Sequence, residues 1–189
     1  IKATETLGQF YLFGKYVPIS QELAFYYLKC SASLGSITSQ NGIGCMYYTG
    51  NSYVSINYSN SFYWYKKSAD KHDPKGLFMI GLMYCDGTGI DQDIVLAKRY
   101  LEDAANLGFY SAYVKLGDIY YLKHKYGVHN FDKAFEYYKI AAENHQPFAE
   151  YMLGTIYYSG EYVAKDYKEV VKWFTRAIEH GNGNAMFKL

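Results

Sequence analysis

A repeat of 36–37 residues runs through the chain and constrains its fold more than any other feature. An apolar residue followed by Gly recurs in steps of 36 or 37 residues, at Leu7-Gly8, Ile43-Gly44, Ile80-Gly81, Leu116-Gly117 and Leu153-Gly154. A Tyr follows each of these glycines by three residues, and a small residue precedes each pair by four. Apolar, small and aromatic residues at this spacing share one face of a helix. Short helical units that repeat at a constant step bury their apolar faces by stacking on one another.

A second block in each repeat also has helical spacing. These blocks begin at Ala24, Ser61, Ala97, Ala134 and Val170. The fourth place of each block is aromatic: Tyr27, Trp64, Tyr100, Tyr137 and Trp173. Four residues before each block stands a residue of the helix N-cap type: Ser20, Asn57, Asp93, Asn130 and Asp166. We expect the fourth-place aromatics, the two Trp included, to face the core between the helices.

The two blocks predict an all-α fold, a right-handed α/α superhelix (solenoid) of about five helix-turn-helix repeats plus a truncated sixth. Short loops force antiparallel helix pairs, and such pairs stack. First helices are expected near 2–13, 38–49, 75–86, 111–123 and 148–159, with a sixth starting near 184. Second helices are expected near 21–34, 58–71, 94–107, 131–144 and 167–180. The whole chain, 1–189, is predicted to be one domain with repeats at 3–38, 39–75, 76–111, 112–148, 149–184 and a partial repeat at 185–189.

The loops after the first helices carry turn signals. The Tyr that follows each recurrent glycine by three residues is called the structural Tyr. In four repeats a Gly follows it by three residues, at Gly14, Gly50, Gly87 and Gly160, where a left-handed backbone would end the helix. The fourth repeat departs from this pattern with Lys123.

Composition argues against several classes of function. The chain has 19 basic and 18 acidic residues, so it lacks the basic excess typical of nucleic-acid binding. No apolar run approaches the roughly 20 residues that a membrane span needs. Its three cysteines are odd in number and match no metal pattern, which favours a cytoplasmic over a secretory location. The chain begins and ends inside helices, so we expect it to be part of a longer array.

No sequence motif indicates catalysis, and we predict no catalytic, cofactor-binding or metal-ligating residue. HExxH and GxSxG motifs are absent. His124 and His129 flank a long loop, where ordinary polar loop residues explain them better than a metal site does. His72, His145 and His180 end second helices, where the helix dipole favours them. Asn57 begins a glycosylation sequon, but its N-cap position explains it better.

The pattern resembles the Sel1-like repeat family, a relative of the tetratricopeptide repeat with a longer step. The third repeat matches it closely, in Ile80-Gly81, Tyr84, Gly87, Gly89-Ile90, Asp93, Ala97, Tyr100-Leu101 and Ala104-Ala105. The resemblance implies a scaffold or adaptor without a catalytic site, because the family is not defined by one. It implies a peptide or protein partner. The alternatives are a regulatory repeat region of a larger enzyme or complex, and a hydrolase-type enzyme with a site between repeats.

The resemblance also implies where a partner binds, because the first helices line the concave groove in related two-helix repeats. The groove positions in the first three repeats are Lys2, Glu5, Gln9, Leu12, Phe13, Thr38, Asn41, Cys45, Tyr48, Thr49, Lys75, Phe78, Leu82, Cys85 and Asp86. The predicted partner-binding residues are Asn41, Tyr48, Phe78, Asp118, Tyr121, Tyr151 and Tyr158. Three of these tyrosines, at 48, 121 and 158, follow the structural Tyr by one residue and so turn about 100° from the core. The alternative is that these rings only pack on adjacent helices. The oligomeric state is not predicted.

Overall fold

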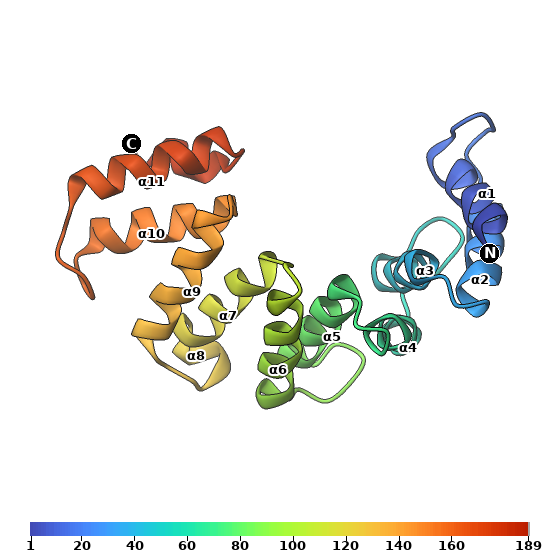
Figure 1. Cartoon of the computed structure of the whole chain (residues 1–189), viewed down its shortest axis with the longest axis horizontal. Coiled ribbons are helices and arrows are strands. Elements are labelled where there is room, and N and C mark those ends of the chain that lie inside the picture. The colour runs from blue at the N-terminus through green and yellow to red at the C-terminus, as the bar shows by residue number, and fades with distance from the viewer. Residues whose placement is uncertain (189) are drawn as a thin grey trace. The chain divides into compact units, whose positions relative to one another are not determined.

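The helical prediction is confirmed along the chain. The computed structural model describes residues 1–188, except for the side chains of residues 123 and 124. The described residues form helices and turns and contain no β-strand, as expected for an all-α repeat solenoid. In chain order the elements are α1 (Lys2–Phe13), α2 (Gln21–Ser33), α3 (Ile37–Thr49), α4 (Tyr58–Ala69), α5 (Pro74–Asp86), α6 (Ile94–Asn106), α7 (Ser111–Tyr121), α8 (Lys123–Tyr126), α9 (Phe131–Glu143), α10 (Pro147–Ser159), α11 (Tyr167–Glu179) and the 3-10 helix η1 (Gly183–Phe187) (Figure 1).

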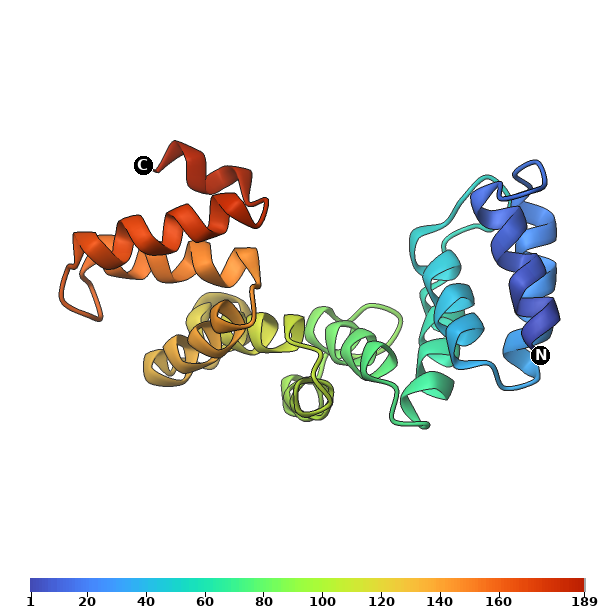
Figure 2. The same ribbon diagram turned by 45° about the horizontal axis from the view of Figure 1, so that its top comes forward.

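The chain divides into two compact units, residues 1–103 and residues 104–189. In the first unit α1 packs on α2 and α3 on α4, and the α2–α3 and α4–α5 contacts join successive hairpins. In the second unit α7 packs on α9 and α10 on α11, with α9 against α10 (Figure 2). Within each unit, helices therefore pack in pairs and neighbouring pairs contact each other, as the repeat predicts.

The N-caps predicted for the second helices are confirmed. Each side-chain oxygen accepts a hydrogen bond from a backbone N–H in the first turn, at Ser20, Asn57, Asp93, Asn130 and Asp166. Gly14, Gly87 and Gly160 end their helices in the left-handed conformation, also as predicted. These caps satisfy backbone groups that a helix end leaves unpaired, so they set where each helix starts and stops.

The fourth repeat ends its first helix differently. Helix α7 stops at Tyr121 rather than at residue 123, and α8 follows with Leu122 between them. Lys123 stands where the other repeats have glycine, so the left-handed turn is replaced by a further helical turn. Tyr126 of α8 is buried, and its hydroxyl lies 2.9 Å from the Lys115 ammonium, which donates to it. The partial sixth helix forms as η1, and Leu189 lies outside the described residues.

In every repeat the recurrent glycine touches the fifth residue of the second block. A Cβ added at these glycines would lie 3.1 Å or less from that residue's side chain. The pairs are Gly8 with Leu28, Gly44 with Tyr65, Gly81 with Leu101, Gly117 with Tyr138 and Gly154 with Phe174. The second members are at most 3% exposed. The glycines thus allow the two helices of a hairpin to approach closely around one large side chain.

The fourth-place aromatics pack beside these pairs. Trp64 and Trp173 are buried, which confirms their predicted core position. Where the fourth place is Tyr, its ring stacks on the structural Tyr of the first helix with centroids 5.7–5.9 Å apart: Tyr11 on Tyr27, Tyr84 on Tyr100 and Tyr120 on Tyr137. The three hairpins with tyrosine at the fourth place therefore combine one glycine contact with one contact between stacked rings.

Alanine substitution distinguishes a contact glycine from a permissive one. In Gly117→Ala the new Cβ would meet the Tyr138 ring at 2.7 Å, so we expect a loss of about 1–3 kcal/mol in the free energy of unfolding. Gly42 lies inside α3 with only Leu28 Cδ1 near, at 3.8 Å. Gly42→Ala should therefore stabilise the chain by about 0.5–1 kcal/mol. Urea unfolding of both variants measures the difference, and equal effects would contradict the assignment.

Candidate partner-binding groove

A pocket of about 480 Å³ opens in the first unit between α1 and α3. It is lined by Gln9, Leu12, Phe13, Gln21, Leu28, Thr38, Gly42, Cys45, Met46, Thr49, Gly50, Asn51 and Lys75. Seven of these are groove positions that the repeat pattern predicts: Gln9, Leu12, Phe13, Thr38, Cys45, Thr49 and Lys75. The pocket therefore includes some of the predicted groove positions, and their part in partner binding stays a prediction.

The pocket has an apolar wall with polar edges. Leu12, Leu28 and Met46 supply aliphatic surface, and the Phe13 ring stands 73% exposed. The Thr49 hydroxyl already donates to the Cys45 carbonyl. Lys75 is the one charged side chain among the lining residues. A pocket of this composition suits an apolar anchor side chain next to polar or acidic groups.

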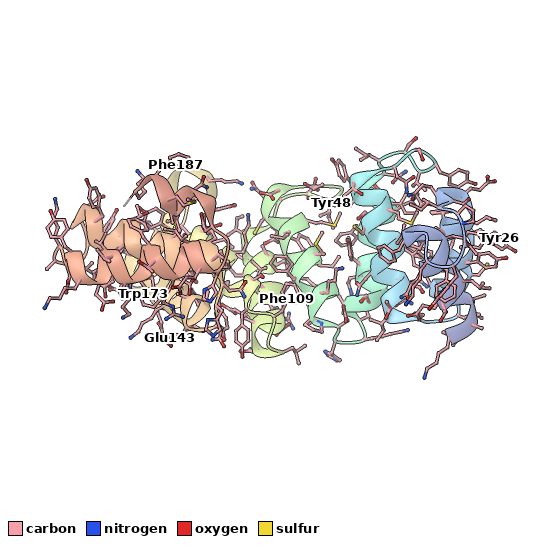
Figure 3. The ribbon with its side chains drawn as sticks, turned by 90° about the horizontal axis from the view of Figure 1, so that it is seen from above. Tyr26, Tyr48, Phe109, Glu143, Trp173 and Phe187 are labelled. Carbon is pink, nitrogen blue, oxygen red and sulfur yellow. The ribbon has the colours of Figure 1, made fainter. Side chains whose placement is uncertain are left out.

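A second hollow of similar size, about 460 Å³, lies on the outer face of α2. It is lined by Phe25, Tyr26, Lys29, Cys30, Ser33 and Tyr53. Tyr26 is 60% exposed there, and it lies apart from Tyr48 of α3 (Figure 3). The outer face is therefore the rival to the α1–α3 pocket as a binding surface.

Asn41, one of the predicted partner-binding residues, bonds to a neighbouring helix cap inside the first unit. Its side chain is only 7% exposed, and its Nδ2 donates to Asp73 Oδ2 at 2.8 Å. Asp73 in turn caps α5 by accepting from the Gly76 N–H. Asn41 thus holds the start of the next first helix rather than facing solvent. Cys85, another predicted groove position, is fully buried.

The other predicted residues of the first unit are half-buried. The Tyr48 ring meets Tyr58 edge-on, with centroids 5.5 Å apart. Phe78 is half-buried on α5. Neither residue lines the α1–α3 pocket. Their part in partner binding stays a prediction.

In the second unit the predicted tyrosines differ from one another. Tyr158 is 55% exposed, and Tyr151 packs on the Phe174 ring at 5.8 Å. Tyr121 is half-buried, and its ring approaches three others, Phe131, Tyr138 and Tyr162. The packing alternative therefore describes Tyr121, whereas Tyr158 has the exposure that a contact residue needs.

Asp118 is held by the hairpin core. The Tyr138 hydroxyl donates to Asp118 Oδ1 at 2.7 Å, which provides the partner that a buried phenol needs. Burial raises the pKa of the Asp118 carboxyl above its ordinary value of 3.8, while the Tyr138 hydrogen bond and nearby lysines oppose that rise. Burial also raises the pKa of Tyr138, and the Asp118 charge adds to the effect. Asp118 is thus engaged with the tyrosine that faces Gly117.

The raised pKa gives Asp118→Asn a pH-dependent effect. Because the folded state holds the proton more tightly than the unfolded state, Asp118 contributes stability below pH 3.8 that is lost as pH rises through its folded pKa. Asn keeps an oxygen for Tyr138 and has no proton to lose. We expect the stability of the variant relative to the wild type to increase between about pH 4 and pH 7 in urea unfolding. The exposed Asp103→Asn is the control, and a flat difference for Asp118→Asn would contradict the burial.

The structure also joins residues that the sequence left apart. His145, Glu150 and His180 place ligand-type atoms within 4.8 Å of one another in the second unit. The repeat pattern places the two histidines at helix ends and indicates no role for Glu150. The His124 side chain, part of the metal pair considered from sequence, lies outside the described residues.

A smaller hollow of about 330 Å³ lies among α9, α10 and α11.

The described helices define an α-solenoid repeat protein. Five consecutive segments match the Sel1 repeat: residues 5–36, 37–73, 74–109, 111–145 and 147–182. The chain therefore belongs to the Sel1 repeat family. This fold generally serves as a protein–protein interaction scaffold, and proteins of the family are typically not enzymes.

Similar proteins come from bacteria and a giant virus. A Sel1 repeat protein from Oxalobacter formigenes is 28% identical with a TM-score of 0.90, covering 100% of this chain and 76% of that one. A protective antigen of uropathogenic Escherichia coli is 29% identical with a TM-score of 0.81, covering 96% and 39%. A Sel1-like repeat-containing protein of Acanthamoeba polyphaga mimivirus is 29% identical, and the match covers 46% of this chain and 22% of the relative. The chain thus spans well under half the length of two of these relatives.

Among the described residues, no helix has the length and apolar character that crossing a bilayer requires.

Proposed function

We propose that this chain is an interaction module that holds a peptide segment of a partner protein in the pocket between α1 and α3. The observation that carries the proposal is that seven of the residues lining this pocket are positions that the repeat pattern directs away from the hairpin core. Gly44 faces Tyr65 of the paired helix, whereas Cys45 and Thr49 of the same helix line the pocket. The side of α3 that is not used for the hairpin is thus available to a partner.

The chemistry of the pocket describes its occupant. An apolar side chain would insert between Leu12 and Met46 and remove the exposed Phe13 ring from water. Aromatic anchors in such pockets carry much of the binding free energy in protein interfaces. The Lys75 ammonium at the pocket edge would favour an acidic residue or carboxyl group next to the anchor. The proposed ligand is therefore a short amphipathic segment with one large apolar residue and a neighbouring acid.

The chain spans only part of the length of two relatives, which supports a related role within a longer polypeptide. The chain spans 39% of the uropathogenic antigen and 22% of the viral relative. In such a protein the same pocket would hold a segment of another domain or of an associated subunit. The groove chemistry is the same in both cases, so one experiment addresses both.

A matched pair of exposed aromatics tests the location. Peptides selected on the wild-type chain from a random library provide the probe, and their dissociation constants are measured for Phe13→Glu and Tyr26→Glu. Both rings are mostly exposed, at 73% and 60%, so both variants should fold, which their melting curves verify. If Phe13 is a hot spot worth about 2 kcal/mol, its variant binds roughly 30-fold more weakly, and Tyr26→Glu binds like the wild type.

The reverse result would contradict the proposal. Loss of binding in Tyr26→Glu with unchanged binding in Phe13→Glu would move the interface to the outer face of α2. Unchanged binding in both variants would exclude both hollows of the first unit.

A further inference from the structure

Three ligand-type side chains meet at the junction of the last two repeats. His145 lies in the turn between α9 and α10, Glu150 in the first turn of α10, and His180 at the end of α11. His180 Nδ1 lies 2.8 Å from Glu150 Oε2, and the two imidazole rings meet edge-on with centroids 4.9 Å apart. One ligand atom from each of the three residues falls within a group no wider than 4.8 Å.

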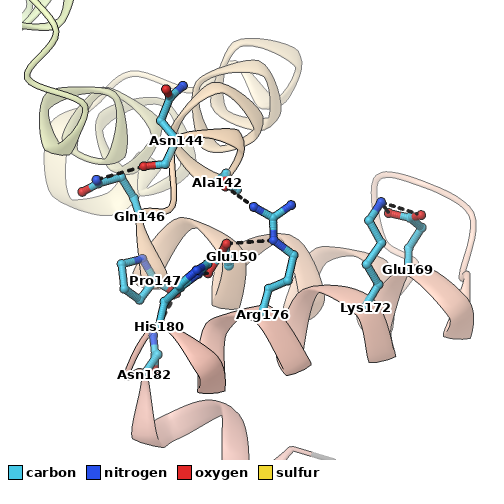
Figure 4. Close-up of polar contacts among 10 residues, drawn as sticks. All are labelled: Ala142, Asn144, Gln146, Pro147, Glu150, Glu169, Lys172, Arg176, His180 and Asn182. Carbon is cyan, nitrogen blue, oxygen red and sulfur yellow. Dashed lines mark hydrogen bonds and ion pairs between the residues drawn. The ribbon is translucent and has the colours of Figure 1, made fainter.

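The carboxylate at the centre of this cluster is fully buried. Glu150 is 0% exposed, and its Oε1 lies 3.1 Å from Arg176 Nε (Figure 4). That N–H does not point at Oε1, so the contact is an ion pair and Oε1 lacks an aligned hydrogen bond. A second guanidinium nitrogen of Arg176 donates to the Ala142 carbonyl at 3.0 Å. Arg176 therefore balances the buried charge on one side of the carboxylate and leaves Oε2 turned toward His180.

The equivalent junction between the first two repeats shows that the fold does not need this cluster. Gln40 occupies the place of Glu150, and its Nε2 donates to the Ala32 carbonyl at 3.1 Å. Lys71 occupies the place of His180 and donates to the Gly35 carbonyl at 2.6 Å. That junction is closed by one neutral hydrogen bond from Gln40 and one from the exposed Lys71. A glutamate at the same place cannot donate, and Arg176 supplies the missing donor instead.

The backbone conformation at His145 favours glycine over histidine. His145 has a φ of +57°, in the left-handed region, whereas Gly35 holds the equivalent place in the first repeat with a φ of +97°. A side chain at positive φ is strained relative to glycine. A buried carboxylate and a histidine at a glycine-type place both cost stability, and both face the same point. Strained residues with converging polar groups are typical of binding sites.

We propose that His145, Glu150 and His180 bind a divalent transition-metal ion of the zinc type. Two imidazole nitrogens and one carboxylate oxygen are donors that Zn²⁺ takes at about 2.0–2.2 Å, which places donors about 3.3 Å apart around a tetrahedral ion. His180 Nδ1 and Glu150 Oε2 are somewhat closer than that, while the group as a whole extends to 4.8 Å, so binding requires small movements of the side chains and loss of the Nδ1 proton. Both histidines are exposed, which gives the ion access and leaves a fourth position for water.

Bound metal would join three segments of the second unit: the α9–α10 turn, the start of α10 and the end of α11. It would tie the last hairpin to the one before it. The site is separate from the α1–α3 pocket, so the two proposals stand or fall independently.

Other repeats supply substitutions that the fold tolerates. The variants are His145→Gly, Glu150→Gln and His180→Asn, because Gly35, Gln40 and Asn144 occupy the equivalent places. His72→Gly is the matched control. It has the same place and a φ of +56°, but Leu77 stands where Glu150 would be. The probes are Co²⁺, followed by its visible absorption, and Zn²⁺, followed by calorimetry and by the melting temperature.

The proposal expects the wild type and His72→Gly to bind one equivalent of either ion and to melt at a higher temperature when it is present. Each cluster variant should bind at least tenfold more weakly, because loss of even an outer-shell partner costs about 10–100-fold in metal affinity. It should also lose the rise in melting temperature. Two outcomes would overturn the proposal: a wild-type chain that binds neither ion, or cluster variants that bind as tightly as His72→Gly does.

Discussion

The contact between a glycine and a large side chain inside each hairpin is the interaction on which the rest of the structure depends. A Cβ at any of the five recurrent glycines would collide with, or press hard on, the residue opposite. Close packing leaves interiors little room to absorb such a change. The glycine therefore sets how near the two helices lie and which way the first helix is turned. Once Gly44 faces Tyr65, the residues one and five places later on the same helix, Cys45 and Thr49, must face elsewhere, and they line the α1–α3 pocket.

The same contact explains why some predicted groove residues interact with side chains of the hairpin core. Where the large residue is tyrosine, its buried hydroxyl needs a polar neighbour. Tyr138 finds it in Asp118, one place after the contact glycine. Burial raises the pKa of Tyr65, and the adjacent Cys45 thiol adds to the rise. Groove positions next to the glycine are thus shared between the core and the surface.

Much of the fold could be predicted from sequence because the signals are local and repeated. N-cap side chains such as Asp93, and left-handed glycines such as Gly87, act within one helical turn, and the helix bounds follow within a residue or two. Helix α8 could not be predicted, because Lys123 indicates only that the usual glycine turn is absent and not which structure replaces it. The packing of Tyr121 was undecided because its ring partners come from other elements, which the helical period does not locate.

The histidine cluster was missed for a different reason. His145, Glu150 and His180 meet only through the stacking of successive hairpins. A signal did exist, since aligning the repeats places glutamate where Gln40 stands and histidine where Gly35 stands. Residues that depart from the repeat pattern can therefore indicate a site, because the other repeats show which residues the fold accepts at the same place.

A double-mutant cycle on Gly154 and Phe174 tests the central contact most directly. The single variants Gly154→Ala and Phe174→Ala and the double variant are unfolded in urea. Gly154→Ala introduces a Cβ 2.6 Å from the Phe174 ring, and Phe174→Ala leaves a cavity facing that Cβ. Direct contact predicts a double variant less destabilised than the sum of the single variants, by about 1–3 kcal/mol. Additive effects within about 0.5 kcal/mol would show that the two residues do not oppose each other, and would contradict the account.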